Sequence, residues 1–301
     1  STLSSSSAAS DVYKRQLVDH VIFSPRANIR FNPSEAVNLR VSYAGGYRAP
    51  QAFDEDMHIA VVGGKRVRIR LADDLKEERS HSVSLSADLY HNFGRVQTNL
   101  LVEGFYTILD DVFALRDLED TDDGGKIKER YNGSGAAVRG FNVEGRAIFT
   151  RWFELQAGVT LQQSRYKEPE QWSEDADVPP VRRMFRTPDA YGYFTASFKP
   201  VRNFTADLTG TCTGSMLVQH MAGSGVAQDA AVSTPSFFDM NVRLSYDLRI
   251  YKEITLQLYG GVQNLFNAYQ KDFDKGADRD SGYIYGPSLP RSWFVGAKFS
   301  F

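Results

Sequence analysis

The residues best suited to chemistry form an acidic cluster that follows an alternating segment near the start of the chain. Asp54, Glu55, Asp56 and His58 follow one another closely there. Carboxylate oxygens and imidazole nitrogens are ligands for a metal ion or a metal chelate. We predict that these four residues bind ligand from an extracellular loop. The alternative is a hydrated, acidic loop tip.

Two further acidic stretches have no clear ligand geometry. Residues 272–280 place four aspartates around Gly276, and residues 120–129 contain a similar run. The first stretch resembles a calcium loop loosely, but it lacks the terminal glutamate and the spacing of an EF-hand. We therefore predict no metal site in either stretch. Such loops could instead bind divalent ions that bridge neighbouring lipopolysaccharide molecules.

Hydrolytic catalysis would require a serine, a histidine and a carboxylate within hydrogen-bond reach. The nearest candidate is His81, which lies between Ser80 and Ser82. In an extended strand, successive side chains point to opposite faces, so His81 and Ser82 cannot act as base and nucleophile. The chain also contains no GxSxG, no HExxH and no glycine-rich phosphate loop. We predict that it is not an enzyme and that it holds no cofactor.

The elements that carry these residues alternate apolar and polar side chains over long stretches. In residues 238–247, for example, Phe238, Val242 and Leu244 share one face, while Asp239 and Arg243 share the other. This period of two indicates strands with two chemically different faces. About eleven are predicted: 26–32, 36–47, 80–92, 96–114, 135–149, 153–166, 188–199, 203–215, 236–248, 254–267 and 290–301.

The composition alone conceals this pattern. A 42% hydrophobic content and a net charge of -2 would suit an ordinary soluble protein. No apolar run approaches the roughly 18 residues of a spanning helix, so membrane insertion would have to use strands. The basic residues are scattered, which argues against binding of nucleic acid. The single cysteine, Cys212, excludes an intramolecular disulfide framework.

The predicted connections alternate between tight and long. Tight links lie near 91–95, 150–152, 199–202 and 249–253, whereas long polar links lie near 117–134, 167–185, 217–234 and 269–289. All the long loops therefore fall at one end of the sheet. Outer-membrane β-barrels have short periplasmic turns and long extracellular loops, whereas a soluble β-sandwich has no reason to impose this asymmetry. We predict an antiparallel transmembrane β-barrel in a bacterial outer membrane, with its C-terminus on the periplasmic side.

The two ends of the chain differ in character. The last strand alternates Trp293, Val295, Ala297, Phe299 and Phe301, and its terminal aromatic is typical of the closing strand of an outer-membrane barrel. Residues 1–16 are of low complexity and end in DVYKRQ, which resembles a translated sequencing adapter. We predict that residues 1–16 are non-native or disordered and that residues 17–301 form the barrel portion. An odd number of strands cannot close in an antiparallel manner, so part of the barrel is expected elsewhere.

Four motifs together resemble the TonB-dependent receptors. They are NLRVSYAGGYRAPQAFDED (38–56), LKEERSHS (75–82), VQNLFNAYQ (262–270) and YGPSLPRSWFVGAKFSF (285–301). The resemblance implies that the chain is the C-terminal half of a 22-stranded, plugged barrel whose plug and first strands are missing here. It also implies import of a metal chelate: a ferric siderophore, haem or cobalamin. The implied partners are the TonB complex through the missing N-terminal region, the barrel assembly machinery through the last strand, and outer-membrane lipid and lipopolysaccharide.

Several side chains have expected structural roles in this arrangement. Arg48 follows Gly45 and Gly46 at a strand end, and we expect it to face the plug. Phe266, Tyr269, Trp293 and Phe301 are expected to anchor the barrel at the membrane interfaces. The amides of Asn264 and Asn267 are expected to hold the chain where it leaves a strand. The alternative function is a complete small barrel that acts as a passive pore or a structural protein.

Overall fold

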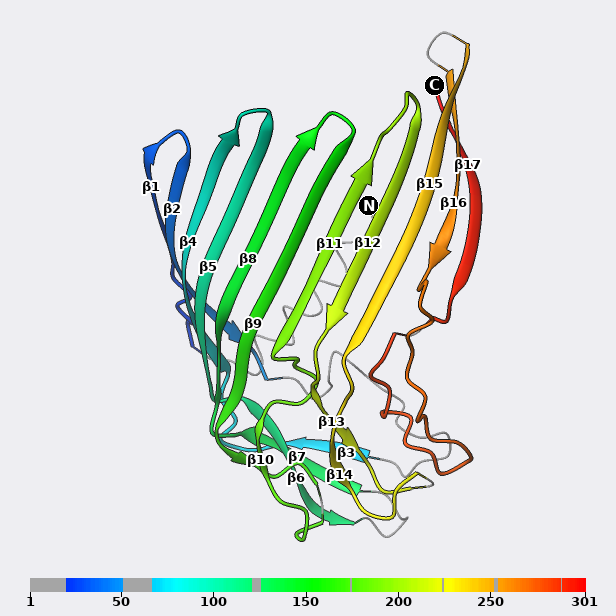
Figure 1. The fold of residues 1–301 in the computed structure, drawn as a ribbon. Helices are drawn as coiled ribbons and strands as arrows, with labels where there is room; N and C mark the ends of the chain where they lie inside the picture. The colour runs from blue at the N-terminus through cyan, green and yellow to red at the C-terminus, as the bar shows by residue number, and fades with distance from the viewer. Residues whose placement is uncertain are drawn as a thin grey trace.

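The computed structural model describes residues 20–50, 67–120, 126–173, 175–223, 225–251, 254–287 and 289–301. Strands are the regular elements of these segments, and none of the segments forms a helix long and apolar enough to cross a membrane. The fold is therefore all-β, as predicted. Figure 1 shows long, tilted strands standing side by side, with short strands gathered at one end.

Eleven long strands form a continuous antiparallel meander in which each strand pairs with its neighbours in chain order. Every predicted strand is present, with ends shifted by a few residues. The strands are β1 (Arg26–Ser34), β2 (Val37–Arg48), β4 (Glu78–Phe93), β5 (Val96–Asp110), β8 (Ala136–Thr150), β9 (Phe153–Glu170), β11 (Ala190–Phe198), β12 (Phe204–Thr213), β15 (Phe237–Tyr251), β16 (Ile254–Gln263) and β17 (Ser292–Ser300).

The connections between these strands alternate as predicted. The tight turns β1–β2, β4–β5, β8–β9 and β11–β12 lie at the upper end in Figure 1, where β15 also ends and β16 begins. The described parts of the long connections lie at the lower end. Gly94 closes the β4–β5 turn with a φ of 61°, a left-handed conformation that glycine adopts without steric cost. Asn203 reaches 68° at the β11–β12 turn, where a short polar side chain tolerates it.

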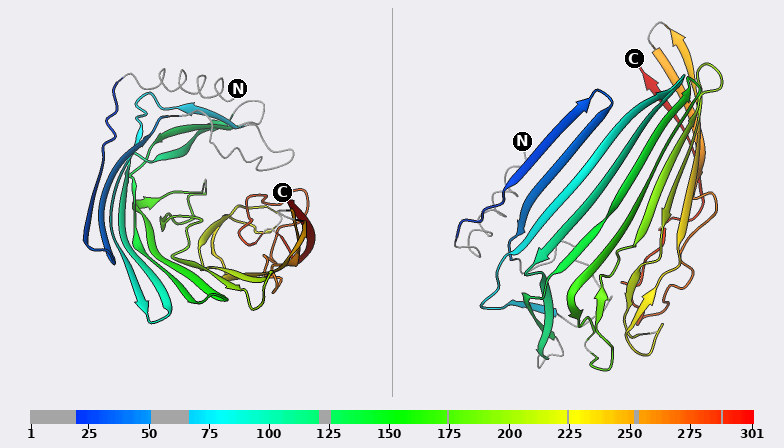
Figure 2. Two further views of the ribbon diagram at one scale, coloured as in Figure 1. Left: turned by 90° about the horizontal axis from the view of Figure 1, so that it is seen from above. Right: turned by 60° about the vertical axis from the view of Figure 1, so that its left-hand side comes forward.

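The sheet exposes its apolar face instead of burying it. On β4, Val83 and Leu85 are exposed, while Ser82, Ser84 and Ser86 between and beside them are only partly accessible. Seen from above, the sheet curves into an open C (Figure 2). Side chains spread apart on the convex face of a curved sheet, so the more exposed apolar set belongs to the outside and the polar set lines the concave face.

The described part of the chain has almost no conventional hydrophobic core. Apart from Tyr283, its buried apolar residues are alanines and valines, whereas Leu85, Phe141 and Leu161 are at least 55% exposed. A soluble sandwich would cover such a face with a second sheet. No second layer covers it among the described residues, so the sandwich alternative is wrong. The outer face requires an apolar solvent such as lipid.

Aromatic side chains gather on the outer face at the tight-turn end. Phe153 stacks against Phe149 and Phe198, with ring centroids 5.1 and 4.7 Å away, and Trp152 lies 5.9 Å from it. These rings belong to three neighbouring strands and the turn between two of them. Such a girdle is typical of the membrane–water interface of β-barrels.

The described parts of the long connections contain six short strands that alternation did not predict. β3 (Val67–Leu71), β7 (Lys126–Asn132) and β6 (Phe113–Asp120) form one small sheet, and β13 (Leu217–His220) pairs with β14 (Ala230–Ser233). β10 (Val181–Arg183) adds to the end of β9. The loops therefore form a structured layer at one end of the curved sheet (Figure 1).

Candidate ligand-binding cavity at the loop end

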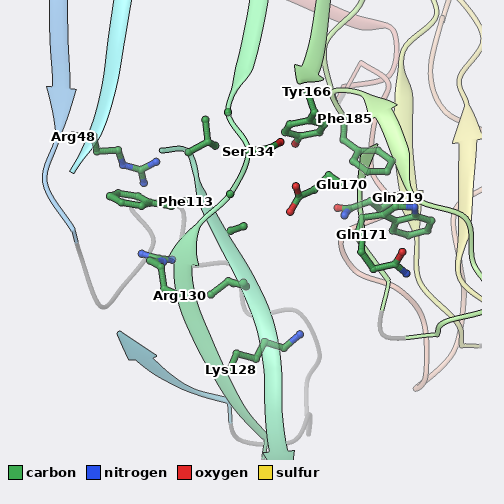
Figure 3. Close-up of a pocket in the computed structure, with 16 residues that line it drawn as sticks. Arg48, Phe113, Lys128, Arg130, Ser134, Tyr166, Glu170, Gln171, Phe185 and Gln219 are labelled. Atoms are coloured by element: carbon green, nitrogen blue, oxygen red, sulfur yellow. The ribbon is translucent and has the colours of Figure 1, made fainter. Parts of the chain in front are cut away.

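A cavity of about 360 Å³ lies where the concave face meets the structured loops. Its walls come from the end of β2, the β6–β7 hairpin, the end of β9 and the loops beyond it (Figure 3). Alternate side chains of β2 and β9 point to the polar, concave face, among them Ser42 and Thr160. Arg48 and Tyr166 belong to the same alternating sets, so they point into the cavity on that face. Its volume falls in the range of about 300–1,000 Å³ that is usual for small-molecule sites.

One wall combines two arginines with an aromatic ring. The guanidinium carbon of Arg48 lies 5.6 Å from the centroid of the Phe113 ring, and that of Arg130 lies 6.0 Å from it. In Figure 3 the ring lies between the two side chains. Arg48 also approaches Glu78 at 3.8 Å. These contacts hold the arginines in fixed orientations toward the cavity, which lowers the entropic cost of binding an anion.

The opposite wall carries further aromatic side chains and one acid. Trp172 and Phe185 meet edge to face with centroids 5.3 Å apart, and Tyr166 lies nearby (Figure 3). Glu170 also lines this wall, well beyond the apolar stretch of β9 that ends at Leu161. Burial raises the pKa of Glu170 above its ordinary value, because the charged carboxylate loses solvation there.

The charges around the cavity favour an anion. Arg48, Lys128 and Arg130 contribute three positive charges to the cavity lining, against the carboxyl of Glu170 in the lining and that of Glu78, which lies 3.8 Å from Arg48. The Glu170 carboxyl is easier to protonate than usual. The aromatic walls suit flat groups, which stack on ring faces. The arrangement can bind a small organic anion with planar parts.

The acidic residues singled out from the sequence are not part of this cavity. Asp54, Glu55, Asp56 and His58 lie outside the described residues, so their role as ligands stays a prediction. Within the segments that the structure describes, no group of three or more histidine, cysteine, aspartate or glutamate side chains is arranged to hold a metal ion. Arg48 lines the cavity, and its contact with a plug stays a prediction as well.

Two aspartates of residues 272–280, Asp272 and Asp274, contact protein side chains that hold the last long loop in place. Tyr283 and Tyr285 donate hydrogen bonds to Asp272 at 2.9 and 2.5 Å, and Asp274 lies 2.9 Å from the Nε2 atom of His220. The His220 and Tyr283 rings stack at 3.7 Å. Burial, followed by the hydrogen bond to Asp272, raises the pKa of Tyr283 to about 12. These contacts fasten the last long loop to the β13–β14 hairpin.

The asparagines of residues 262–270 hold the chain as it leaves β16. Asn264 and Asn267 adopt left-handed φ values of 50° and 53°. The Asn264 side chain donates to the Ala268 and Leu289 carbonyls and accepts from the Ala268 amide, while Asn267 accepts from the amide of Arg291. The expected restraint by the two amides is therefore present.

The four expected interface anchors lie at the ends of the sheet. Phe266 packs near Phe238 with centroids 5.9 Å apart. Trp293, 77% exposed, is the second residue of β17, at the long-loop end. Tyr269 is partly exposed just beyond Phe266, and Phe301 is fully exposed after the last strand. Their anchoring role stays a prediction.

The structure separates the nearest candidates for catalysis. His81 bonds to the Tyr43 hydroxyl at 2.8 Å on the apolar face, whereas Ser82 bonds to the Thr107 hydroxyl at 2.9 Å on the polar face. The predicted opposition of His81 and Ser82 is confirmed.

An antiparallel sheet with an apolar convex face, a polar concave face and a ligand-sized cavity under structured loops defines the wall of a membrane β-barrel receptor. Residues 4–265 match the family described as TonB dependent receptor-like, beta-barrel. The chain belongs to this family of outer-membrane transport receptors. No curated protein matches it.

Three solved structures of similar fold are much longer than this chain. The ferric-catecholate import receptor Fiu of E. coli K12 has 18% identity and a TM-score of 0.61, over 92% of this chain and 34% of that one. A variant of the ferric enterobactin receptor PfeA of Pseudomonas aeruginosa has 16% identity and a TM-score of 0.62, over 91% and 39%. The iron transporter FrpB of Neisseria meningitidis has 17% identity and a TM-score of 0.59, over 91% and 38%. The present chain therefore spans less than half of each.

Proposed function

We propose that the protein containing this chain imports a small, anionic metal chelate with planar groups across the outer membrane, with energy delivered by the TonB complex. The cavity at the loop end carries this proposal, because its three cations and its aromatic walls match such a ligand. It opens at the concave face, on the side that would lead into a barrel lumen. The long loops are extracellular in this proposal, and the tight turns and the C-terminus are periplasmic.

The chemistry of the cavity narrows the choice of chelate. Of the ferric siderophores, haem and cobalamin suggested by the sequence, those with carboxylate or phenolate groups suit Arg48, Lys128 and Arg130 best. The printed names of Fiu and PfeA describe ferric-catecholate and ferric-enterobactin receptors, which supports an iron chelate as the first class to test.

The chain is proposed to form half of the wall of a larger β-barrel. Within the described residues, β1 pairs with β2 alone and β17 with β16 alone, which leaves two sheet edges. In lipid, each unpaired backbone group costs several kcal/mol. Further strands and a plug from the same protein would satisfy these edges and fill the concave side, with the last strand recognised by the barrel assembly machinery. The open edges disfavour a passive pore of eleven strands.

The test uses the receptor expressed from its complete gene and purified in detergent. Ferric catecholates, haem and cobalamin are titrated while tryptophan fluorescence is recorded, since Trp172 lies in the cavity wall. We expect saturable quenching by one anionic chelate. Arg48→Gln and Lys128→Gln should each weaken binding about tenfold, because each removes a charge-assisted contact.

The matched control is Arg279→Gln, which removes the same charge from a different long loop. Arg279 donates to the carbonyl of Gly276 and does not line the cavity. The Arg279→Gln receptor should bind the chelate with the same affinity as the wild type. Equal losses for Arg279→Gln and Arg48→Gln, or the absence of quenching by every chelate, would refute the proposed cavity.

A further inference from the structure

The last long loop supports one wall of the ligand cavity from behind. Phe185 and Gln219 lie on the same side of the cavity, as Figure 3 shows. Each is followed directly by a residue, Arg186 or His220, that contacts residues 282–284 of the last long loop. Residues 282–284 do not line the cavity themselves. This wall therefore has one side toward the ligand and one side toward the loop.

Arg186 makes the most direct of these connections. Its guanidinium donates to the carbonyl of Ile284 at 2.8 Å and to that of Gly282. The Gly282 carbonyl also accepts from the Ile284 amide at 2.8 Å, so these residues form a tight turn. A guanidinium holds its N–H donors in a rigid plane, which allows one arginine to bind two carbonyls at once. On the other side of the turn, the buried Tyr283 ring stacks on His220.

The backbone of Arg186 adopts a conformation that does not suit an arginine. Its φ of 57° is left-handed, a region that glycine enters freely and other residues rarely occupy. The Arg186 amide donates to the carbonyl of Leu217 at 2.8 Å, and Phe185 forms a β-bridge with the same residue. An unfavourable backbone conformation persists only where other contacts impose it. The two guanidinium contacts are such a restraint.

Phe185 transmits the support of the loop to the rest of the wall. Its ring meets that of Trp172 edge to face, with centroids 5.3 Å apart. Apart from this contact, the Trp172 indole donates to the carbonyl of Pro179 at 3.3 Å. If Phe185 moved, Trp172 would therefore lose the ring that orients it. A ligand that has to order a free side chain on binding loses about two- to tenfold in affinity for each.

We propose that Arg186 is a positioning residue of the ligand cavity. It holds the 282–284 turn behind Phe185 and so fixes the aromatic wall before a chelate binds. The inference rests on the proposed binding of a chelate in this cavity. It makes the last long loop part of the binding site, although the 282–284 turn never touches the ligand.

Two substitutions in the receptor from its complete gene, purified in detergent, test this role. Arg186→Gly suits the left-handed backbone and removes the clamp, whereas Arg186→Lys keeps the positive charge and removes the planar fork. Arg186 is exposed and lies outside the long strands, so neither variant should prevent folding of the barrel. The probes are ferric enterobactin, haem and cobalamin. Both variants should bind the chelate about tenfold more weakly than the wild type, because two side chains lose their order.

A second measurement needs no chelate. Acrylamide quenching of Trp172 is obtained as the difference between each receptor and its Trp172→Phe counterpart, which removes the signal of the other tryptophans. In both Arg186 variants the quenching of Trp172 should increase, and its emission should shift to longer wavelength, because the indole loses its contact with Phe185.

The matched control is Arg279→Gly. Arg279 donates to the carbonyl of Gly276 at 3.0 Å in the same loop, so its removal should change neither readout. Unchanged quenching of Trp172 in Arg186→Gly, or equal effects of Arg279→Gly, would overturn the positioning role. Wild-type affinity in Arg186→Lys would also overturn it, since charge alone would then explain the loss in Arg186→Gly. If no chelate bound the wild type, the proposed function would fail, and the quenching of Trp172 would still decide whether Arg186 positions the wall.

Discussion

Placing one charge on the convex face tests the assignment of the two faces directly. Leu244 is 47% exposed near the middle of the apolar stretch of β15, and its register partners are the small residues Ala206 and Gly260. An arginine at this position has room, so overpacking does not contribute to its cost. If lipid covers this face, Leu244→Arg should destabilise the folded receptor by about 2–4 kcal/mol.

The size of the effect should depend on depth in the membrane. Leu248 shares the face but lies four residues closer to the tight turn, about 14 Å along the strand. At a tilt of about 40°, this is about 10 Å in depth, near the edge of an apolar band about 25 Å tall. Leu248→Arg should therefore cost only about 1 kcal/mol.

The adjacent residue of opposite parity is the control. Arg243 faces the concave side, where it donates to Gln257 at 3.2 Å and lies 4.7 Å from the Tyr259 ring centroid. Arg243→Leu removes these contacts and should cost about 1 kcal/mol or less. The assay is reversible urea unfolding of the receptor in phospholipid vesicles, followed by tryptophan fluorescence. Equal losses of unfolding free energy for Leu244→Arg and Arg243→Leu would refute the assignment of the two faces. A larger loss for Leu248→Arg than for Leu244→Arg would refute the placement of Leu244 deeper in the membrane than Leu248.

Three further predictions concern the loops. Because burial raises the pKa of Glu170, affinity for an anionic chelate should rise as the pH falls through that raised pKa, and Glu170→Gln should abolish the dependence in fluorescence titrations. Asn264→Ala removes three hydrogen bonds at a left-handed residue and should cost about 1–3 kcal/mol in urea unfolding, whereas Asn92→Ala at an exposed strand end should cost nothing measurable. Folding raises the pKa of Tyr283 from 10.0 to about 12, so the stability that this phenol contributes is lost as the pH rises through that range. Asp272→Asn should lower the phenol pKa in absorbance titrations, and an unchanged pKa would contradict the assigned hydrogen bond.

The long strands could be predicted from sequence because one solvent covers each face for their full length. Lipid on one side and a polar interior on the other force a strict period of two, as in Val83, Leu85 and Leu89 of β4. The tight turns add independent signals, such as the glycine at position 94. The eleven strands and their alternating connections therefore followed from local patterns alone.

The loop strands and the cavity could not be predicted in this way. β3 and β7 pair in parallel across a long stretch of chain, so neither segment shows where its partner lies. The cavity combines Arg48, Phe113 and Tyr166 from three separate parts of the chain. The acidic cluster at 54–58 attracted attention because its residues are adjacent in sequence. A contiguous cluster is visible in a sequence, whereas one assembled by the fold is visible only once the register of the strands is known.

Residue parity on β9 links the proposed cavity to the outer face of the sheet. On β9, Tyr166 and Glu170 point to the cavity on the concave side, whereas Leu161 and Gln163 point to the outer face. A slip of one residue in register would exchange the two sets and abolish the cavity. Because adjacent residues serve different solvents, substitutions on the outer face should leave the cavity intact. Chelate affinity should therefore be unchanged in Arg139→Gln, which replaces the register partner of Gln163 on the outer face.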